Sequence, residues 1–191
     1  MINTTLLAYG LNKYYNNADK AHKIIIACAG AAAAAEGIGG SIPGLAVPAI
    51  IISSFGAVWT MYGKLCKTLG ITLRKSVLKL LARAALSNIA ANLSSALLTL
   101  LAAQFIPGAS VLASAAIGFI SVYLAGMLFL QMILRLAEKS KDASSFDDIS
   151  EKEMKDTIHT IKLTKDDLDA AKAEFSNVQE KAEPTDDRTA G

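Results

Sequence analysis

Three long runs without a charged residue dominate the sequence and limit the folds that it can adopt. They cover residues 42–61, 84–106 and 109–134, and a helix of that length crosses a bilayer core of about 30 Å. Hydrophobic residues make up 52% of the chain and the mean hydropathy is +0.38, both high for a water-soluble domain. A shorter run at residues 24–35, followed by Glu36, predicts either a short span or a partly inserted helix. We therefore expect an all-α integral membrane protein.

An internal repeat arranges these runs in pairs. Residues 42–58 and residues 106–122 share seven identities at an offset of 64 positions, and each copy begins with Ile-Pro-Gly. An apolar segment, a Pro-Gly turn and a second apolar segment predict a helical hairpin. Two such hairpins, at residues 24–62 and 84–135, give about four apolar helices. The predicted turns lie at Pro43, Gly44, Pro107 and Gly108.

Lysine and arginine flank the predicted hairpins but are missing from their tips. Residues 1–137 carry ten Lys and Arg and two acids, whereas residues 138–191 carry nine Lys and Arg and fifteen acids. The basic residues of the first part lie before, between and after the hairpins. The positive-inside rule therefore places both termini in the cytoplasm and the protein in the cytoplasmic (inner) membrane. The alternative is that each hairpin dips into the bilayer without crossing it.

The segment between the hairpins, residues 63–83, is basic and carries no acid. Its apolar residues recur at helical spacing, which predicts a basic amphipathic connector helix on anionic lipid headgroups. The alternative is a charged connector that packs on its own domain. The predicted lipid-facing residues are Lys64, Lys67, Arg74, Lys75, Lys79 and Arg83. Residues 1–23 similarly predict an interfacial segment, because Leu7, Leu11 and Tyr14 share one helical face; an ordinary packed helix is the alternative.

Two sets of small or polar residues lie inside the second predicted hairpin. The first set falls on one helical face and predicts either hydrogen bonds between helices or the lining of a water-filled pore. Four helices leave too little room for a channel, so a pore requires a homo-oligomer. This polar stripe consists of Asn88, Asn92, Ser95 and Thr99. The second set, Ser114 and Gly118 with Gly126 two turns further on, predicts close helix packing.

The last part of the chain, residues 136–191, predicts a soluble, acidic, helical tail with a disordered end at residues 183–191. We expect one helix near residues 149–162 and another near residues 165–181. Thr164 is the predicted N-cap of the second helix, because an acid follows it three residues later. An apolar stripe on this helix predicts packing on a partner or on the other tail helix. The stripe consists of Leu168, Ala171, Phe175 and Val178.

The residues that usually carry catalysis are scattered. No P-loop or dinucleotide-binding fingerprint is present, and His22 and His159 predict solvated surface positions. Cys28 and Cys66 lie in or beside apolar stretches without zinc-site spacing. We therefore expect no enzyme, no cofactor, no metal and no nucleic-acid partner. Glu36 is a functional candidate because it is ionisable and close to the membrane; a place at a hairpin tip among lipid headgroups is the alternative.

Two stretches resemble the membrane domain of unknown function that follows the GTPase module in many bacterial GTPase-like proteins. The resemblance covers about residues 24–134. The first block is similar at Pro43, Ala46, Met61, Leu65, Leu69 and Gly70, and the second at Pro107, Gly108, Ala115, Ala116, Tyr123 and Gly126. Val47 and Pro48 stand where the family often has an acidic residue, and this chain has no GTPase module. The resemblance implies a membrane module that works with a separately supplied, nucleotide-driven partner.

Together these features predict a non-enzymatic integral membrane protein that serves as an anchor or adaptor. In this interpretation the hairpins enter the bilayer, the basic connector binds anionic lipid, and the acidic tail docks a cytoplasmic protein. We expect that partner to be a GTPase or a membrane-remodelling system. The alternative is an oligomeric pore-forming membrane effector or defence protein. A weaker alternative is a chaperone or immunity protein for a membrane-active partner.

Overall fold

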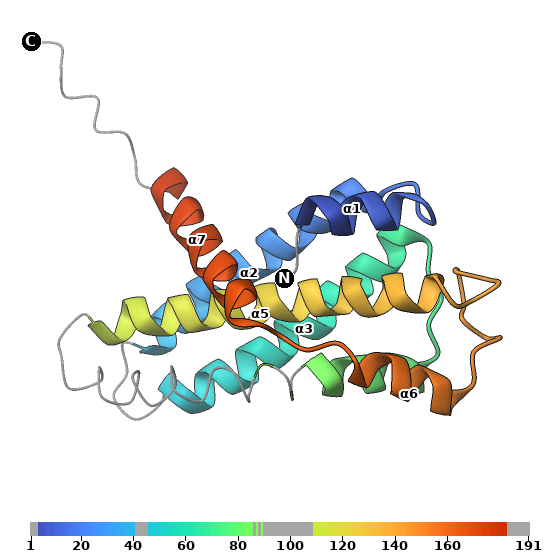
Figure 1. Ribbon diagram of the computed structural model, residues 1–191. Helices are drawn as coiled ribbons and strands as arrows, with labels where there is room; N and C mark the ends of the chain where they lie inside the picture. Colours follow the sequence, from blue (N-terminus) through green and yellow to red (C-terminus); the bar gives the residue numbers. More distant parts are fainter. Residues whose placement is uncertain (1–3, 41–45, 86, 88, 90–108, 183–191) are drawn as a thin grey trace, which may run out of the picture.

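The computed structural model describes residues 4–40, 46–85, 87, 89 and 109–182 (Figure 1). Within these ranges the chain forms helices joined by turns and loops, without a strand, which confirms the all-α prediction. The helices are α1 (Thr4–Asn12), α2 (Ala18–Gly40), α3 (Ala46–Leu69), α5 (Ala109–Ala137), α6 (Glu151–His159) and α7 (Lys165–Ala182). A further helical stretch covers residues 75–85.

Helix α5 is the centre of the molecule, and every other labelled helix contacts it (Figure 1). Its 29 residues contain no proline and no charge before Arg135, and they are rich in good helix formers. Residues Val111–Ala137 make α5 the one helix in the described part of the chain that is long and apolar enough to cross a membrane. However, 83% of its most apolar window is buried by the protein itself, and a soluble core helix meets the same criteria. Four apolar membrane helices are therefore not confirmed.

Helices α2 and α3 correspond to the two predicted arms of the first hairpin, and they pack on each other and on α5. Helix α2 is longer than expected, because it starts at Ala18 and continues through Glu36 and Gly37 to Gly40. Five consecutive alanines, residues 31–35, favour the helical state enough to extend it into the glycine-rich end. Figure 1 shows α2 running opposite to both α3 and α5.

Helix α1 packs on the bundle, which agrees with the alternative of an ordinary packed helix for the N-terminal segment. Leu7 and Leu11 are buried, whereas Tyr14 lies on the exposed side. Tyr15, in the turn after α1, is also buried. The apolar face of α1 therefore contacts protein.

The basic segment 63–83 is not one continuous helix, which corrects the predicted connector. Helix α3 ends at Leu69, and Gly70 follows in the left-handed region with φ of +70°. The amide of Ile71 donates to the carbonyl of Cys66 at 2.9 Å, and the amide of Gly70 donates to that of Lys67 at 3.4 Å. This bonding pattern is a Schellman C-cap, which satisfies the free carbonyls of a helix end and reverses the chain. The basic residues are therefore divided between α3, the loop after it and residues 75–85.

The two predicted tail helices are present as α6 and α7, with ends close to those expected. The Ser150 hydroxyl caps α6 by accepting from the amide of Glu153 at 3.2 Å. The predicted N-cap of α7 is confirmed, because the Thr164 amide donates to Asp167 Oδ2 at 2.8 Å and the Asp167 amide donates back to Thr164 Oγ1. The N-terminal end of each of these two helices is thus fixed by local hydrogen bonds that the sequence alone specifies.

The apolar stripe of α7 packs on α5, which differs from both predicted destinations. The ring centroids of Phe175 and Phe119 lie 5.4 Å apart, and Ala171 is fully buried. In Figure 1, α7 rises steeply across α5 and away from α6. The tail is therefore part of the same helical assembly as the apolar helices.

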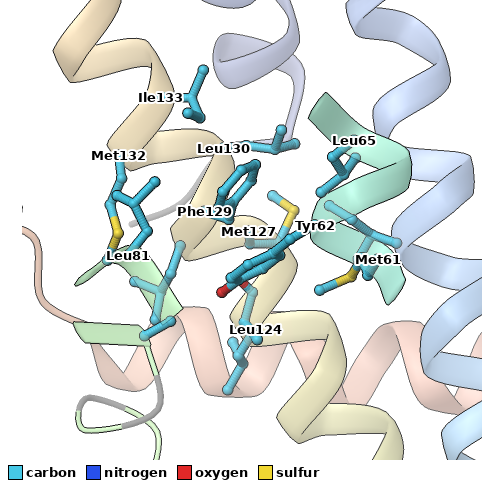
Figure 2. Close-up of a cluster of buried hydrophobic side chains, with 14 of the residues drawn as sticks. Met61, Tyr62, Leu65, Leu81, Leu124, Met127, Phe129, Leu130, Met132 and Ile133 are labelled. Carbon is cyan, nitrogen blue, oxygen red and sulfur yellow. The ribbon is translucent and has the colours of Figure 1, made fainter. Parts of the chain in front are cut away.

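The core between α3 and α5 is built around one aromatic pair. Tyr62 and Phe129 stack with ring centroids 4.2 Å apart, and the Tyr62 hydroxyl donates to the carbonyl of Ala125 at 3.1 Å. Figure 2 shows Leu81, from the helical stretch at residues 75–85, on the same cluster as Met132. All of these side chains are buried, so the cluster joins α3, α5 and residues 75–85 into one unit.

Candidate functional site

The most extensive contact between the described helices lies along α2 and α5, where glycines of α5 face side chains of α2. A Cβ placed on Gly126 would lie 2.6 Å from Ile25 Cγ1, and one on Gly118 would lie 1.9 Å from Glu36 Oε2. Residues near the end of α2 contact residues near the start of α5, so the two helices are antiparallel. The predicted close packing at Gly118 and Gly126 is therefore confirmed, and the contact is the α2–α5 seam.

Glu36 lies inside this seam and is only 1% exposed. The structure thus contradicts a place among solvated headgroups at a hairpin tip. Ser114, one helical turn before Gly118, is also buried, and its Oγ has no hydrogen-bond partner among the described residues. The seam therefore holds two polar side chains within an otherwise apolar contact, and burial of such groups is costly.

Charge is strongly divided along the three packed helices α2, α3 and α5. After Lys23, the one acidic or basic side chain in α2 is the buried Glu36. Helix α3 carries none before Lys64, and α5 carries none before Arg135. Helix α2 runs opposite to α3 and α5. Lys23, Lys64 and Arg135 therefore lie towards the same end of the bundle. Ile25 lies opposite Gly126 and Tyr62 stacks on Phe129, so Lys23 and Lys64 are level with about residue 128 of α5. We name the part of the bundle beyond that level the uncharged end, made of residues 24–40, 46–62 and 109–127, and the part that holds these basic residues the charged end.

The charged end is closed by a loop at residues 138–150 that ties distant parts of the chain together. The Tyr15 hydroxyl donates to the Ala143 carbonyl at 2.8 Å, and the Thr72 amide donates to the Ser144 carbonyl at 2.7 Å. Phe146 is buried in this loop although its φ is +57°, a conformation that a bulky residue adopts only when held by its surroundings. Figure 1 shows α1, α6 and this loop gathered at the same end.

Two aspartates give this loop its internal order. Ser144 hydrogen bonds, from both hydroxyl and amide, hold the pKa of Asp142 below its ordinary value. Hydrogen bonds from the Ser140 hydroxyl and the Lys141 amide do the same for the pKa of Asp148. Both carboxylates are therefore charged at neutral pH and act as fixed acceptors within the loop.

All six predicted lipid-facing basic residues are exposed, as an interaction with headgroups requires. They are Lys64, Lys67, Arg74, Lys75, Lys79 and Arg83. Arg74 also forms an ion pair with Asp147 at 3.0 Å, with both side chains more than half exposed. That pair links the loop at residues 138–150 to the segment before residues 75–85, which matches the alternative of a connector that packs on its own domain.

Several large apolar side chains are exposed in the described part of the chain. Leu112 is 54% exposed and Val111 is 38% exposed, both at the start of α5 in the uncharged end. Trp59 on α3 is 40% exposed. Tyr9 and Tyr14 are exposed near the charged end. The uncharged end thus presents apolar surface without a charged residue beside it on these three helices.

Two sets of predicted residues lie outside the described ranges. They are the hairpin turns Pro43, Gly44, Pro107 and Gly108, and the polar stripe Asn88, Asn92, Ser95 and Thr99. Both sets therefore stay predictions.

The two histidines and the two cysteines differ in how far they are buried. His22 is half-buried with Nε2 3.3 Å from the Tyr123 hydroxyl, so it is not the solvated residue that we expected, whereas His159 is exposed. Cys28 is buried in α2, and burial raises the pKa of the half-buried Cys66 thiol to about 11. No group of three His, Cys, Asp or Glu residues that could hold a metal occurs in the ranges that the structure describes.

Three features of this site were missed from the sequence. They are the burial of Glu36 in the α2–α5 seam, the packing of α7 on α5, and the contact of His22 with Tyr123. The burial of Glu36 had a signal in the sequence. Gly118 and Gly126 mark a helix face that leaves room for a large side chain from a neighbouring helix. The other two depend on tertiary contacts that no local pattern specifies. In comparisons with known proteins, no family model, curated protein or solved structure matches this chain.

Proposed function

We propose that the protein is a non-enzymatic membrane anchor or adaptor, with its uncharged end in the bilayer and its charged end in the cytoplasm. The observation that carries this proposal is the division of charge along α2, α3 and α5. Placing a Lys, Arg or Asp at the centre of a membrane helix costs about 2.5–3.5 kcal/mol on insertion scales. The uncharged end places no lysine, arginine or aspartate against acyl chains, and its one carboxylate, Glu36, faces α5.

The exposed basic residues of the charged end support a contact with anionic headgroups. Each Lys or Arg near an anionic membrane surface contributes about 1 kcal/mol of attraction. Lys75, Lys79 and Arg83 follow one another at a spacing of four residues in the helical stretch, so they share one side of it. We expect this side to face the lipid surface.

A vesicle flotation assay tests the membrane half of the proposal. We expect the protein to float with phosphatidylcholine vesicles, to bind better when phosphatidylglycerol is added, and to stay bound in high salt. Replacing Lys75, Lys79 and Arg83 by Gln should remove the preference for anionic lipid. The matched control replaces Lys165, Lys172 and Lys181 of α7 and should keep it. Failure to float with either vesicle would contradict the proposal, and leakage of a self-quenched dye would favour the pore-forming alternative.

The adaptor half of the proposal concerns a cytoplasmic protein, which the resemblance to the GTPase-associated membrane domain implies is a GTPase. The exposed acids of α6, Glu151 and Glu153, offer a docking surface at the charged end. We expect GTP hydrolysis to co-purify with the full chain from its native membrane. Charge reversal at Glu151 and Glu153 should remove that activity, whereas reversal of Asp166 and Asp169 on α7 should not. Equal activity with both variants would argue against docking through α6.

A further inference from the structure

Helix α7 covers part of the uncharged end although its own outer side is charged. Its inward side chains Ala171 and Phe175 are buried against the bundle, and Phe175 packs on Phe119 of α5. Its outward side chains are strongly polar. The exposed ionisable residues of α7 include Lys165, Asp166, Asp169, Lys172, Glu180 and Lys181.

The groove beside α7 is lined on the α2 and α5 side by apolar residues. An apolar groove of about 580 Å³ runs between α7, α2 and α5. Helix α2 contributes Ala33, Ala34 and Gly37 to it, and α5 contributes Val111 and Ala115. The neighbouring side chain of Leu112 is already exposed. The covered surface is therefore continuous with the apolar surface that the proposed function places in the bilayer.

The position of α7 along α5 is incompatible with a bilayer around the same helix. Phe119 lies about nine residues from the border of the uncharged end, near residue 128 of α5, which is about 14 Å along the helix axis. With that border at the headgroups, Phe119 would lie near the middle of a hydrocarbon core of about 30 Å. The charged side of a docked α7 would then face acyl chains, which is unfavourable for ionised groups. Docking of α7 and insertion of the uncharged end therefore exclude each other.

The attachment of α7 is suited to release. Among the apolar side chains of α7 whose burial the structure describes, only Ala171 and Phe175 are buried, while Leu168 and Val178 are half-buried. The mutual hydrogen bonds of Thr164 and Asp167 fix the start of α7 within the helix itself. A released α7 therefore keeps its N-cap and its amphipathic character.

We propose that α7 is a displaceable strap: it covers the α2–α5 face in the aqueous form of the protein, and the acyl chains of a bilayer take its place on insertion. This inference rests on the proposed membrane function. The occupant that replaces α7 is lipid, because the α2 and α5 residues that line the groove are all apolar. The freed stripe of α7 then lies at the cytoplasmic side of the membrane.

A reversible tether tests the strap directly. In the full chain with Cys28→Ala and Cys66→Ala, the changes Ala115→Cys and Val178→Cys place two thiols on the same groove. A short bifunctional thiol reagent that reductant cleaves would then hold α7 in place. Insertion is measured as the fraction that floats with phosphatidylcholine vesicles after a high-salt wash and resists added protease. We expect the tether to lower that fraction at least tenfold and reductant to restore it in the same sample.

A second variant tests the strap without a tether. Phe175→Ala weakens the contact with Phe119 and should speed insertion severalfold, whereas Ser176→Ala on the exposed side should not. Tethered protein that inserts as fast as cleaved protein would overturn the strap and leave the membrane function standing. If neither the cleaved protein nor Phe175→Ala inserts, the membrane function itself fails and the strap with it.

Discussion

The carboxylate of Glu36 occupies the space that a side chain at position 118 would fill. A Cβ on Gly118 would lie 1.9 Å from Glu36 Oε2 and 2.4 Å from its Cδ, well inside van der Waals contact. Glycine at this position thus leaves room for one specific side chain, which would have to move if a larger residue were present.

The first prediction concerns this pair. Gly118→Ala should lower the free energy of unfolding by about 1–3 kcal/mol, because overpacking a buried contact forces side chains to move. In a Glu36→Ala background the same change should have little effect, since the opposing atoms are gone. Chemical denaturation of the four proteins gives this coupling energy. Equal losses in both backgrounds would show that Glu36 does not occupy the seam.

The second prediction compares two glycines in different surroundings. Gly126→Ala should destabilise the protein by about 1–3 kcal/mol, because three Ile25 carbons lie within 3 Å of the added methyl. Gly63→Ala on α3 meets no atom within 4 Å, so it should stabilise the helix by up to about 1 kcal/mol. Thermal unfolding of both variants measures the contrast. A gain of stability for Gly126→Ala would contradict the seam.

The third prediction concerns the Tyr62 hydroxyl, which is buried and donates to the Ala125 carbonyl. Tyr62→Phe should cost about 0.5–1.5 kcal/mol, the usual net value of one hydrogen bond, because the stack on Phe129 is kept. Tyr9→Phe is the control, since Tyr9 is 68% exposed, and it should change stability little. If both changes have the same effect, the bond to Ala125 contributes nothing to folding.

The fourth prediction concerns pH. Burial raises the pKa of Cys66 from 9.0 to about 11, so the reactive thiolate forms only in strong base. In a Cys28→Ala variant at pH 8, Cys66 should be alkylated about 100-fold more slowly than in the unfolded chain. The rate should rise about tenfold per pH unit up to that pKa. Mass spectrometry of iodoacetamide labelling measures it, and a plateau near pH 9 would be inconsistent with the burial.

Local signals in the sequence predicted the ends of the tail helices well. Thr164 and Asp167 form the expected capping box, because capping involves only residues three positions apart. The break at Gly70 also had a local signal, a glycine just after a basic last turn, but the amphipathic pattern across residues 63–83 concealed it.

Tertiary partners could not be predicted in the same way. The apolar stripe of α7 shows that the helix packs on something, and it contains no information on whether the partner is α6, α5 or another protein. The burial of Glu36 depends on the approach of α5, which lies more than 70 positions away in the sequence. The uncharged runs likewise do not distinguish a lipid-facing helix from a core helix such as α5, because both require the same composition.

The central place of α5 has a consequence for the protein during its synthesis. Helices α2 and α3 are complete at Leu69, but their common partner ends only at Ala137. At translation rates of about 5–20 residues per second, the nascent chain holds an uncovered apolar pair for about 3–14 s. During that interval the ribosome presents the pair to whatever apolar surface is nearest. A membrane or a chaperone at the exit site therefore meets α2 and α3 before α5 does, and the site of translation contributes to which contacts form first.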